Sequence, residues 1–238
     1  MMDRMICPVR PGVVCGAKLF PGSRSATVTW SVRAIMASIG LFGGSFDPVH
    51  LGHLLLAESC LEAVGLDAVW WVPAATPPHK VDRHRASAPH RVEMLHLATA
   101  GHPRFRVEEC ELRRGGVSYT VDTLRELTAR EPDHQWYLLM GADTLADLPT
   151  WREPATICRL ATPVVVTRAG EPPVDFSRLP GNVAPERIEA CRRLVVTMPA
   201  IGLSSTDLRQ RVAAGRSIRY RTPRAVEAYI ETQGLYRS

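Results

Sequence analysis

The stretch that decides the fold runs from residue 43 to residue 53 and reads Gly43-Gly44-Ser45-Phe46-Asp47-Pro48-Val49-His50-Leu51-Gly52-His53. It follows a short apolar run, 39–42, that predicts a buried strand, and it precedes an apolar-periodic stretch, 54–64, that predicts a helix. Glycines at a strand end allow a tight turn and a close approach of the backbone to a ligand. The helix start adds unpaired N–H groups and the positive end of a dipole. This order of elements indicates a site for an anion.

Two histidines lie on this segment. His50 and His53 are three residues apart, so they share one face of a helical turn. Two imidazoles beside Gly52 and a helix start suit the binding of a triphosphate, and we favour this interpretation. The alternatives are a zinc site, ordinary core or surface histidines, and a plain turn between strand and helix. A zinc site needs further ligands, and the sequence has no second His/Cys cluster nearby.

Outward from this segment, strand-like and helical stretches alternate. Strands are predicted at 39–42, 68–73, 105–109, 135–140, 162–167 and 193–198. Most of them are continuous apolar runs, which are typical of a parallel sheet covered on both faces. Helices are predicted at 52–64, 89–100, 119–130, 142–148, 154–160, 205–214 and 223–233. The pattern predicts an α/β fold, namely a doubly wound, Rossmann-like parallel sheet with a small C-terminal helical subdomain. In such a fold ligands bind at the carboxyl ends of the strands, and the histidine segment follows the first strand there.

We expect one domain over 38–238, with 203–238 as its C-terminal helical part. Residues 1–37 are rich in Arg, Ser, Pro and Gly, carry one acid and show no clear periodicity. Because Met36 directly precedes the first predicted strand, we interpret residues 1–35 as an overlong start. A genuine disordered extension and a targeting segment are the alternatives.

Two irregular stretches interrupt the alternation, at 74–88 and 169–185. Long loops in compact domains are often functional or mobile. The first loop follows the second strand at the ligand edge, so we expect it to be functional. The second carries no chemistry and is expected to be a variable surface loop.

Charge and cysteine content narrow the class of protein. The net charge is +5, but residues 1–38 carry five basic residues and one acid, so the remainder is near +1. The basic balance therefore gives little support for nucleic-acid binding. The six cysteines are scattered without a Cys-x-x-Cys pair, which is typical of reduced thiols in a cytoplasmic protein. The sequence has no apolar run long enough for a transmembrane helix, so no membrane partner is expected.

Several motifs resemble one family in the order in which they occur. The segment 43–53 resembles the signature of nucleotidyltransferases with a His-x-Gly-His motif. Leu203-Ser204-Ser205-Thr206-Asp207-Leu208-Arg209 is similar to the second signature of that superfamily, Ile-Ser-Ser-Thr-x-Ile-Arg. Further motifs resemble nicotinate-nucleotide adenylyltransferase: Pro77-Pro78-His79-Lys80, Ser118-Tyr119-Thr120, Gly141-Ala142-Asp143, Pro149-Thr150-Trp151 and Gly234-Leu235-Tyr236. The resemblance covers about residues 38–238.

The resemblance implies a reaction. The chain would transfer the AMP group of ATP to nicotinate mononucleotide, giving nicotinate adenine dinucleotide and pyrophosphate in NAD biosynthesis, without a covalent enzyme intermediate. His50 would donate to the α-phosphate as charge develops, and His53 would bind near the leaving pyrophosphate. Arg209 would neutralise a phosphate with its guanidinium fork. Magnesium would arrive on the ATP phosphates, and no metal site formed by the protein is expected.

The resemblance also implies binding residues. For ATP these are Gly43, Gly44, Ser45, Phe46, Gly52, Ser205 and Thr206. For the acceptor they are His79, Lys80, Tyr119, Thr120, Asp143 and Trp151. Plainer roles compete: Ser205 and Thr206 could only cap a helix, and Trp151 could only cover the surface. Two departures from the family pattern, Arg152 after the Trp and Ala74-Ala75 before Pro77-Pro78-His79, affect contacts to the acceptor and not the class of reaction.

Other functions remain open. The nearest is the same transfer to nicotinamide mononucleotide or another phosphorylated acceptor, such as phosphopantetheine. A non-catalytic nucleotide sensor or an RNA-binding protein could use the same fold, but a sensor should have lost His50, His53 or Arg209. A class I tRNA synthetase would need a Lys-Met-Ser-Lys-Ser-like loop and an anticodon-binding extension, and neither is present.

Overall fold

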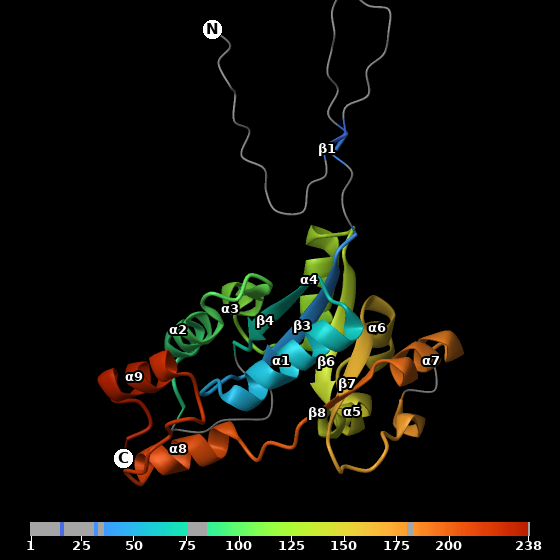
Figure 1. The fold of residues 1–238 in the computed structure, drawn as a ribbon. Helices are drawn as coiled ribbons and strands as arrows, with labels where there is room; N and C mark the ends of the chain where they lie inside the picture. Colours follow the sequence, from blue (N-terminus) through green and yellow to red (C-terminus); the bar gives the residue numbers. More distant parts are fainter. Residues whose placement is uncertain (1–14, 17–30, 33–35, 76–84, 180–182, 238) are drawn as a thin grey trace, which may run out of the picture.

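The computed structural model describes residues 15–16, 31–32, 36–75, 85–179 and 183–237, and at its centre is a parallel sheet of six strands (Figure 1). In chain order the strands are β3 (Ser38–Gly44), β4 (Ala68–Pro73), β5 (Phe105–Val107), β6 (Gln135–Gly141), β7 (Thr162–Arg168) and β8 (Val195–Met198). Across the sheet they lie in the order β5-β4-β3-β6-β7-β8. The chain thus starts in the middle, builds one half and returns to build the other. This is the predicted doubly wound, Rossmann-like order, with its switch point between β3 and β6.

Side chains alternate between the two faces of the sheet, as the pleat requires. Phe42 and Val164 pack on one face, whereas Leu41 and Val165 pack on the other. The first face is covered by α1 (Leu51–Val64), α2 (Ala88–Thr99), α8 (Ser205–Ala213) and α9 (Arg224–Thr232). The second is covered by α3 (Cys110–Arg114), α4 (Thr120–Arg130), α5 (Ala142–Asp147), α6 (Pro154–Leu160) and α7 (Pro185–Arg193), all labelled in Figure 1. Burial on both faces explains why the strands are continuous apolar runs.

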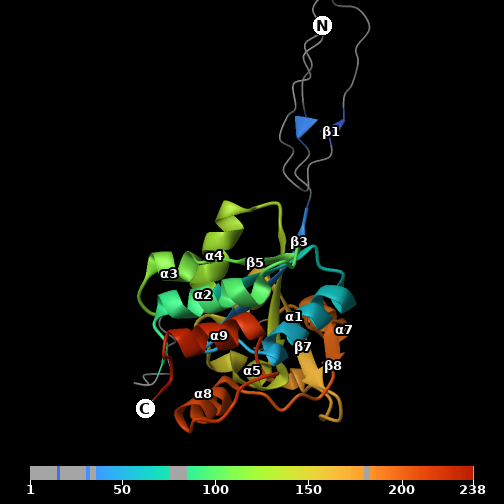
Figure 2. The ribbon, with the colours of Figure 1, turned by 60° about the vertical axis from the view of Figure 1, so that its left-hand side comes forward.

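The C-terminal helices share the core of the sheet. Leu208 of α8 and Val226 and Ile230 of α9 are buried in the same cluster as Phe42. α9 packs against α2, where Tyr229 and His90 form a hydrogen bond of 2.8 Å. The segment after β8 is therefore fixed to the face that carries α1, close to the carboxyl end of β3 (Figure 2).

All predicted strands and helices are confirmed, with boundaries within two residues. Two helices were not predicted. α3 has only five residues, Cys-Glu-Leu-Arg-Arg, which is too short to show a period. α7 has few apolar residues among its charges, and it begins where the predicted irregular loop 169–185 ends. That loop also contains a short 3-10 turn, Phe176–Arg178, and another 3-10 turn, Leu148–Thr150, follows α5.

Little of the N-terminal segment is described. β1 (Cys15–Gly16) and β2 (Ser31–Val32) pair as two-residue antiparallel strands. Met36 is exposed and lies two residues before the start of β3. The interpretation of residues 1–35 as an overlong start otherwise falls outside the described residues.

Candidate functional site

The histidine segment lies at the switch point of the sheet. β3 pairs with β4 on one side and β6 on the other, so its carboxyl end opens between the two halves of the fold. There the chain turns at Gly43 and Gly44 and enters α1 after His50. Two cavities meet this edge, one on each side of the glycine turn.

The first, here called the phosphate cavity, has a volume of about 330 Å³. It is lined by Ser45, His50, Gly52, His53, Leu56, Arg85, Arg168, Met198, Ile201, Leu203, Ser204, Ser205, Thr206 and Arg209. These residues include three arginines and no carboxylate. A cavity with this balance of charge favours a polyanion.

The two imidazoles are stacked in this cavity. The ring centroids of His50 and His53 are 3.7 Å apart, and their planes differ by 17°. The backbone N–H of His50 donates to Nδ1 of His53 over 3.2 Å. In neutral His53 the proton must therefore lie on Nε2, which leaves that N–H available as a donor. His50 is only 6% exposed, and its Nδ1 has no hydrogen-bond partner in the described protein.

Both rings are neutral at physiological pH. Burial lowers the pKa of His50 from its usual 6.5 to about 4. Burial also lowers the pKa of His53, and the neighbouring His50 ring adds to this shift. Two stacked cations would repel each other, whereas two neutral rings can each donate one hydrogen bond. The pair is therefore a set of pre-positioned donors.

Gly44, Gly52 and Phe46 shape the turn around these rings. A Cβ on Gly52 would lie 3.1 Å from two atoms of the His50 ring, and a Cβ on Gly44 would lie 3.0 Å from Phe46. The nearest neighbour of each glycine is thus a ring of the protein itself. Phe46, predicted to bind ATP, is buried with φ +46° and contacts the rings of His53 and Trp71. Its side chain supports the histidine from the core and does not line the cavity.

The C-terminal segment holds the loop between β3 and α1 through its carbonyl groups. The Asp47 carbonyl accepts from Nη1 of Arg209 (2.8 Å), and the Pro48 carbonyl accepts from the Ser205 hydroxyl (2.9 Å). The Val49 carbonyl accepts from the hydroxyl of Thr222 (2.8 Å). Arg209 and Ser205, predicted as phosphate ligands, therefore also fix the backbone that carries His50.

The Asp47 carboxylate is a second anchor of this loop. It is fully buried, and its Oδ1 accepts from the Tyr236 hydroxyl (2.6 Å) and from the Ala86 N–H (3.1 Å). Nη1 of Arg209 lies 3.9 Å from its Oδ2. Arg91 of α2 donates to the carbonyls of Ser45 (2.9 Å) and Ala74 (2.7 Å) from the other side. The first strand, the end of the long loop and the C-terminal segment thus meet at one turn.

The second cavity has a volume of about 220 Å³. It is here called the acceptor cavity, because two of its lining residues, Thr120 and Trp151, are ones that the family resemblance assigns to the acceptor. It is lined by Leu41, Phe42, Gly43, Gly44, Val72, Ala74, Glu111, Ser118, Thr120, Thr123, Leu138, Leu139, Met140, Gly141, Thr144 and Trp151. Gly43 and Gly44, predicted to bind ATP, border this cavity and not the phosphate cavity. Thr120 and Trp151, predicted to bind the acceptor, both line it.

The other predicted acceptor residues are placed differently. Asp143 is exposed on the first turn of α5 and borders neither cavity, because its neighbour Thr144 faces inward instead. Tyr119 packs against the core, with the Arg152 guanidinium 5.0 Å from its ring centroid. His79 and Lys80 lie outside the described residues.

Several lining residues were not predicted from the sequence. In the phosphate cavity these include Arg85 and Arg168. In the acceptor cavity they include Glu111, whose buried carboxyl group accepts from the Thr123 hydroxyl over 2.6 Å. Only their position along the chain could have indicated these two arginines. Arg85 lies near the end of the long loop, which follows β4 at the ligand edge, and Arg168 is the last residue of β7.

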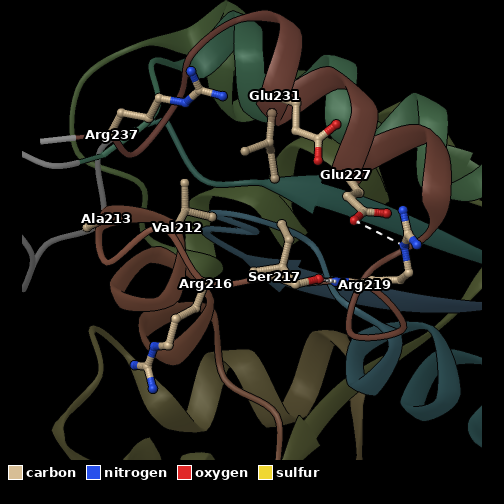
Figure 3. Close-up of a pocket in the computed structure, with 11 residues that line it drawn as sticks. Val212, Ala213, Arg216, Ser217, Arg219, Glu227, Glu231 and Arg237 are labelled. Atoms are coloured by element: carbon tan, nitrogen blue, oxygen red, sulfur yellow. Dashed lines mark hydrogen bonds and ion pairs between the residues drawn. The ribbon is translucent and has the colours of Figure 1, made fainter.

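A larger cavity, of about 560 Å³, lies away from the histidines, between α8 and α9. Figure 3 shows Arg216, Arg219 and Arg237 around it, with Glu227 and Glu231 on α9. Its described lining has no imidazole, and its arginines share the space with two carboxylates. We therefore place the functional site at the switch point, although this cavity is larger.

Within the described ranges no group of three His, Cys, Asp or Glu side chains is suited to a metal ion, so these residues offer His50 and His53 no further ligands for zinc. None of the helices described combines the length and apolar character of a membrane span. Cys60, Cys110, Cys158 and Cys191 are buried and free, as expected for core thiols.

Known sequences are similar to this chain over most of its length. The pattern of the cytidylyltransferase-like family matches residues 41–211. A protein of Rhodopirellula baltica named "Probable nicotinate-nucleotide adenylyltransferase" is 46% identical over 199 residues, which are 84% of this chain and 93% of that protein. A protein of the same name from Thermus thermophilus is 48% identical over 199 residues, which are 84% of this chain and 99% of that protein.

Solved structures share the fold. The Plasmodium falciparum nicotinic acid mononucleotide adenylyltransferase complexed with NaAD superposes with a TM-score of 0.67 at 18% identity, over 84% of this chain and 97% of that one. The same enzyme complexed with APC gives a TM-score of 0.65 at 17% identity, again over 84% and 97%. At this identity the likeness is one of architecture.

Proposed function

The chain belongs to the cytidylyltransferase-like family, and within it to the nicotinate-nucleotide adenylyltransferases, and on this premise we propose that it transfers the AMP group of ATP to nicotinate mononucleotide. The products are nicotinate adenine dinucleotide and pyrophosphate. The observation that carries the proposal is the phosphate cavity, in which two neutral, stacked imidazoles and three arginines lie together, with no carboxylate among the described lining residues.

The reaction needs positioning and charge stabilisation more than covalent chemistry. A phosphate oxygen of the mononucleotide attacks the α-phosphorus of ATP, and the bond to the β-phosphate breaks. Negative charge builds on the α-phosphate oxygens and on the leaving pyrophosphate. His50 donates to the α-phosphate, and Nε2–H of His53 donates toward the leaving group. Because both rings are already neutral donors, neither has to transfer a proton.

The two signatures divide the remaining work. Ser205, Thr206 and Arg209, at the start of α8, hold the β- and γ-phosphates. Ser205 and Arg209 also hold the loop carbonyls. Binding of the triphosphate is therefore coupled to the position of His50.

Magnesium enters as part of the MgATP substrate. Among the described lining residues of the phosphate cavity there is no carboxylate, so the donors open to the ion are phosphate oxygens and water, which Mg²⁺ often prefers. The ion would neutralise part of the triphosphate charge.

The acceptor occupies the other cavity. Trp151 offers its ring to the pyridine, and Thr120 places the first turn of α4 beside the nicotinate carboxylate. The backbone N–H groups at the start of α4 are donors that favour an anion. The neutral amide of nicotinamide would match them less well than the nicotinate carboxylate does. Discrimination of this kind can be large, so nicotinamide mononucleotide should be a poor substrate.

The test is pyrophosphate release with ATP and each of three acceptors: nicotinate mononucleotide, nicotinamide mononucleotide and phosphopantetheine. We expect release with the first to exceed the others by at least about tenfold in kcat/KM, since each 1.4 kcal/mol of lost binding gives about that factor. Mass spectrometry identifies the dinucleotide product. Equal use of nicotinamide mononucleotide would refute the acceptor assignment, and no release with any acceptor while ATP still binds would favour a nucleotide sensor.

A further inference from the structure

Arg85 stands apart from the other arginines of the phosphate cavity. Arg168 pairs with the Glu171 carboxylate at 3.0 Å, and Arg209 donates to the Asp47 carbonyl. For Arg85, the described residues provide neither a hydrogen bond nor an ion pair, although its Nε is buried. A buried guanidinium N–H without a partner is costly, and the cavity it lines is the place where a partner can bind.

The backbone beside Arg85 is fixed to the reactive turn. The N–H of the next residue, Ala86, donates to Oδ1 of Asp47, and both residues are buried. Asp47 lies three residues before His50 in the same loop. Arg85 is therefore attached, through one hydrogen bond, to the segment that carries the imidazoles. Because this backbone is already held in place, less conformational entropy is lost when a ligand binds to Arg85.

We propose that Arg85 is a further phosphate-binding residue, whose guanidinium holds the β,γ-phosphate end of ATP and the departing pyrophosphate. The inference rests on the proposed function for the identity of the polyanion. Arg85 borders the phosphate cavity together with Ser205 and Thr206, and it does not border the acceptor cavity. This placement favours the triphosphate over the phosphate of the mononucleotide.

The chemistry suits this role. A guanidinium presents several N–H donors in a planar fork that matches two phosphate oxygens. The β-phosphate gains charge as the bond to the α-phosphorus breaks, so a cation at that end is stabilising in the transition state as well as in the bound state. Loss of Arg85 should therefore weaken ATP binding and slow the transfer.

The test compares Arg85→Ala and Arg85→Lys with a control, Arg216→Ala. Arg216 is an exposed arginine on the rim of the cavity between α8 and α9 (Figure 3), so its removal changes the net charge equally. Calorimetry with ATP alone gives Kd, and steady-state kinetics gives KM for each substrate. For Arg85→Ala we expect Kd and KM for ATP to rise about 10- to 100-fold, in the range of a charge-assisted hydrogen bond.

The same measurements specify the other outcomes. We expect KM for nicotinate mononucleotide to change less than twofold, Arg85→Lys to recover part of the affinity, and Arg216→Ala to match the wild type. Unchanged ATP affinity in Arg85→Ala, or a rise confined to KM for the mononucleotide, would overturn the inference. If the alanine variant does not fold, Arg85→Gln provides the same comparison.

Failure of this inference is distinguishable from failure of the proposed function. An active wild type with an indifferent Arg85→Ala variant would remove Arg85 alone. A wild type that releases no pyrophosphate, yet loses ATP binding in Arg85→Ala, would leave Arg85 as a phosphate ligand and remove the reaction.

Discussion

The two cavities at the switch point are built in different ways. The phosphate cavity joins segments far apart in the sequence, from Ser45 to Arg209, and hydrogen bonds to loop carbonyls hold it together. The acceptor cavity consists mainly of strand ends and the residues directly after them. Among the described lining residues, the first has three arginines and no carboxylate, whereas the second has Glu111 and apolar walls. The difference teaches that, under the proposed function, charge would direct the triphosphate to the first cavity and leave the second to the pyridine ring.

The strongest test of this division is His50→Ala. If His50 stabilises the transferring phosphate, turnover should fall by about 10²–10³, the usual loss for one preorganised donor. Thermal unfolding should change little, because the described residues offer Nδ1 of this ring no hydrogen-bond partner and its close ring contact is the stacked His53. His96→Ala, at an exposed helix position, is the control. Near-normal turnover of His50→Ala would take His50 out of the mechanism.

The pH dependence of stability tests the neutral state of the phosphate cavity. The pKa of His50 is about 4 in the folded protein and near 6.5 when unfolded, so the unfolded chain binds the proton first as pH falls. Stability should therefore decrease from about pH 6.5 toward pH 4, by about 3 kcal/mol from this residue. Urea unfolding of the wild type and of His50→Gln measures the difference. Parallel curves for the two proteins would show that His50 is not buried as a neutral ring.

Tyr236→Phe tests whether the phosphate cavity depends on distant anchors. The variant removes one hydroxyl from the buried Asp47 carboxylate and leaves the ring in place. We expect a loss of about 2 kcal/mol in unfolding free energy, typical of a hydrogen bond to a charged group. Tyr220→Phe, at an exposed tyrosine, is the matched control. If both variants unfold alike, the anchor contributes nothing to stability.

Trp151→Ala has the smallest expected effect and separates the cavities directly. Loss of the ring should raise KM for nicotinate mononucleotide about tenfold, since aromatic contacts contribute about 1 kcal/mol beyond buried area. Kd for ATP should stay within twofold, because Trp151 borders only the acceptor cavity. A comparable loss of ATP affinity would mean that the two cavities are not independent.

The sequence predicted local features well because local pattern carries them. The first strand of the sheet, the glycine turn and both histidines are contiguous in the sequence. The alternation of apolar runs with helical stretches was enough to predict the parallel sheet. Ser205, Thr206 and Arg209 came from resemblance and do reach the phosphate cavity. The sequence pattern could not predict which distant residues contact this turn. One example is the hydrogen bond from the Tyr236 hydroxyl to the Asp47 carboxylate.

The residues that the sequence analysis missed or misplaced also depend on tertiary contacts that the sequence pattern does not show. Arg85 and Arg168 are single arginines beside irregular segments, and a single arginine has no periodicity. Glu111 lies on a helix too short to predict. Asp143 and Thr144 are neighbours, and only the rotation of α5 decides that Thr144 faces the acceptor cavity. Such choices depend on packing and not on the order of residues.

The bond between Tyr236 and Asp47 also sets a sequence of events during translation. The two residues are 189 positions apart, so Asp47 leaves the ribosome long before its partner is made. At about 5–20 residues per second, this interval is about 10–40 s. During this interval the nascent chain can form β3 and α1. The Asp47 carboxylate does not yet have the Tyr236 hydroxyl as a donor, and for much of the interval the loop carbonyls also wait for Arg209, Ser205 and Thr222. The first strand of the six-stranded sheet thus acquires its finished turn only after the last helices are made, and a ribosome that stalls before Tyr236 leaves this turn incomplete.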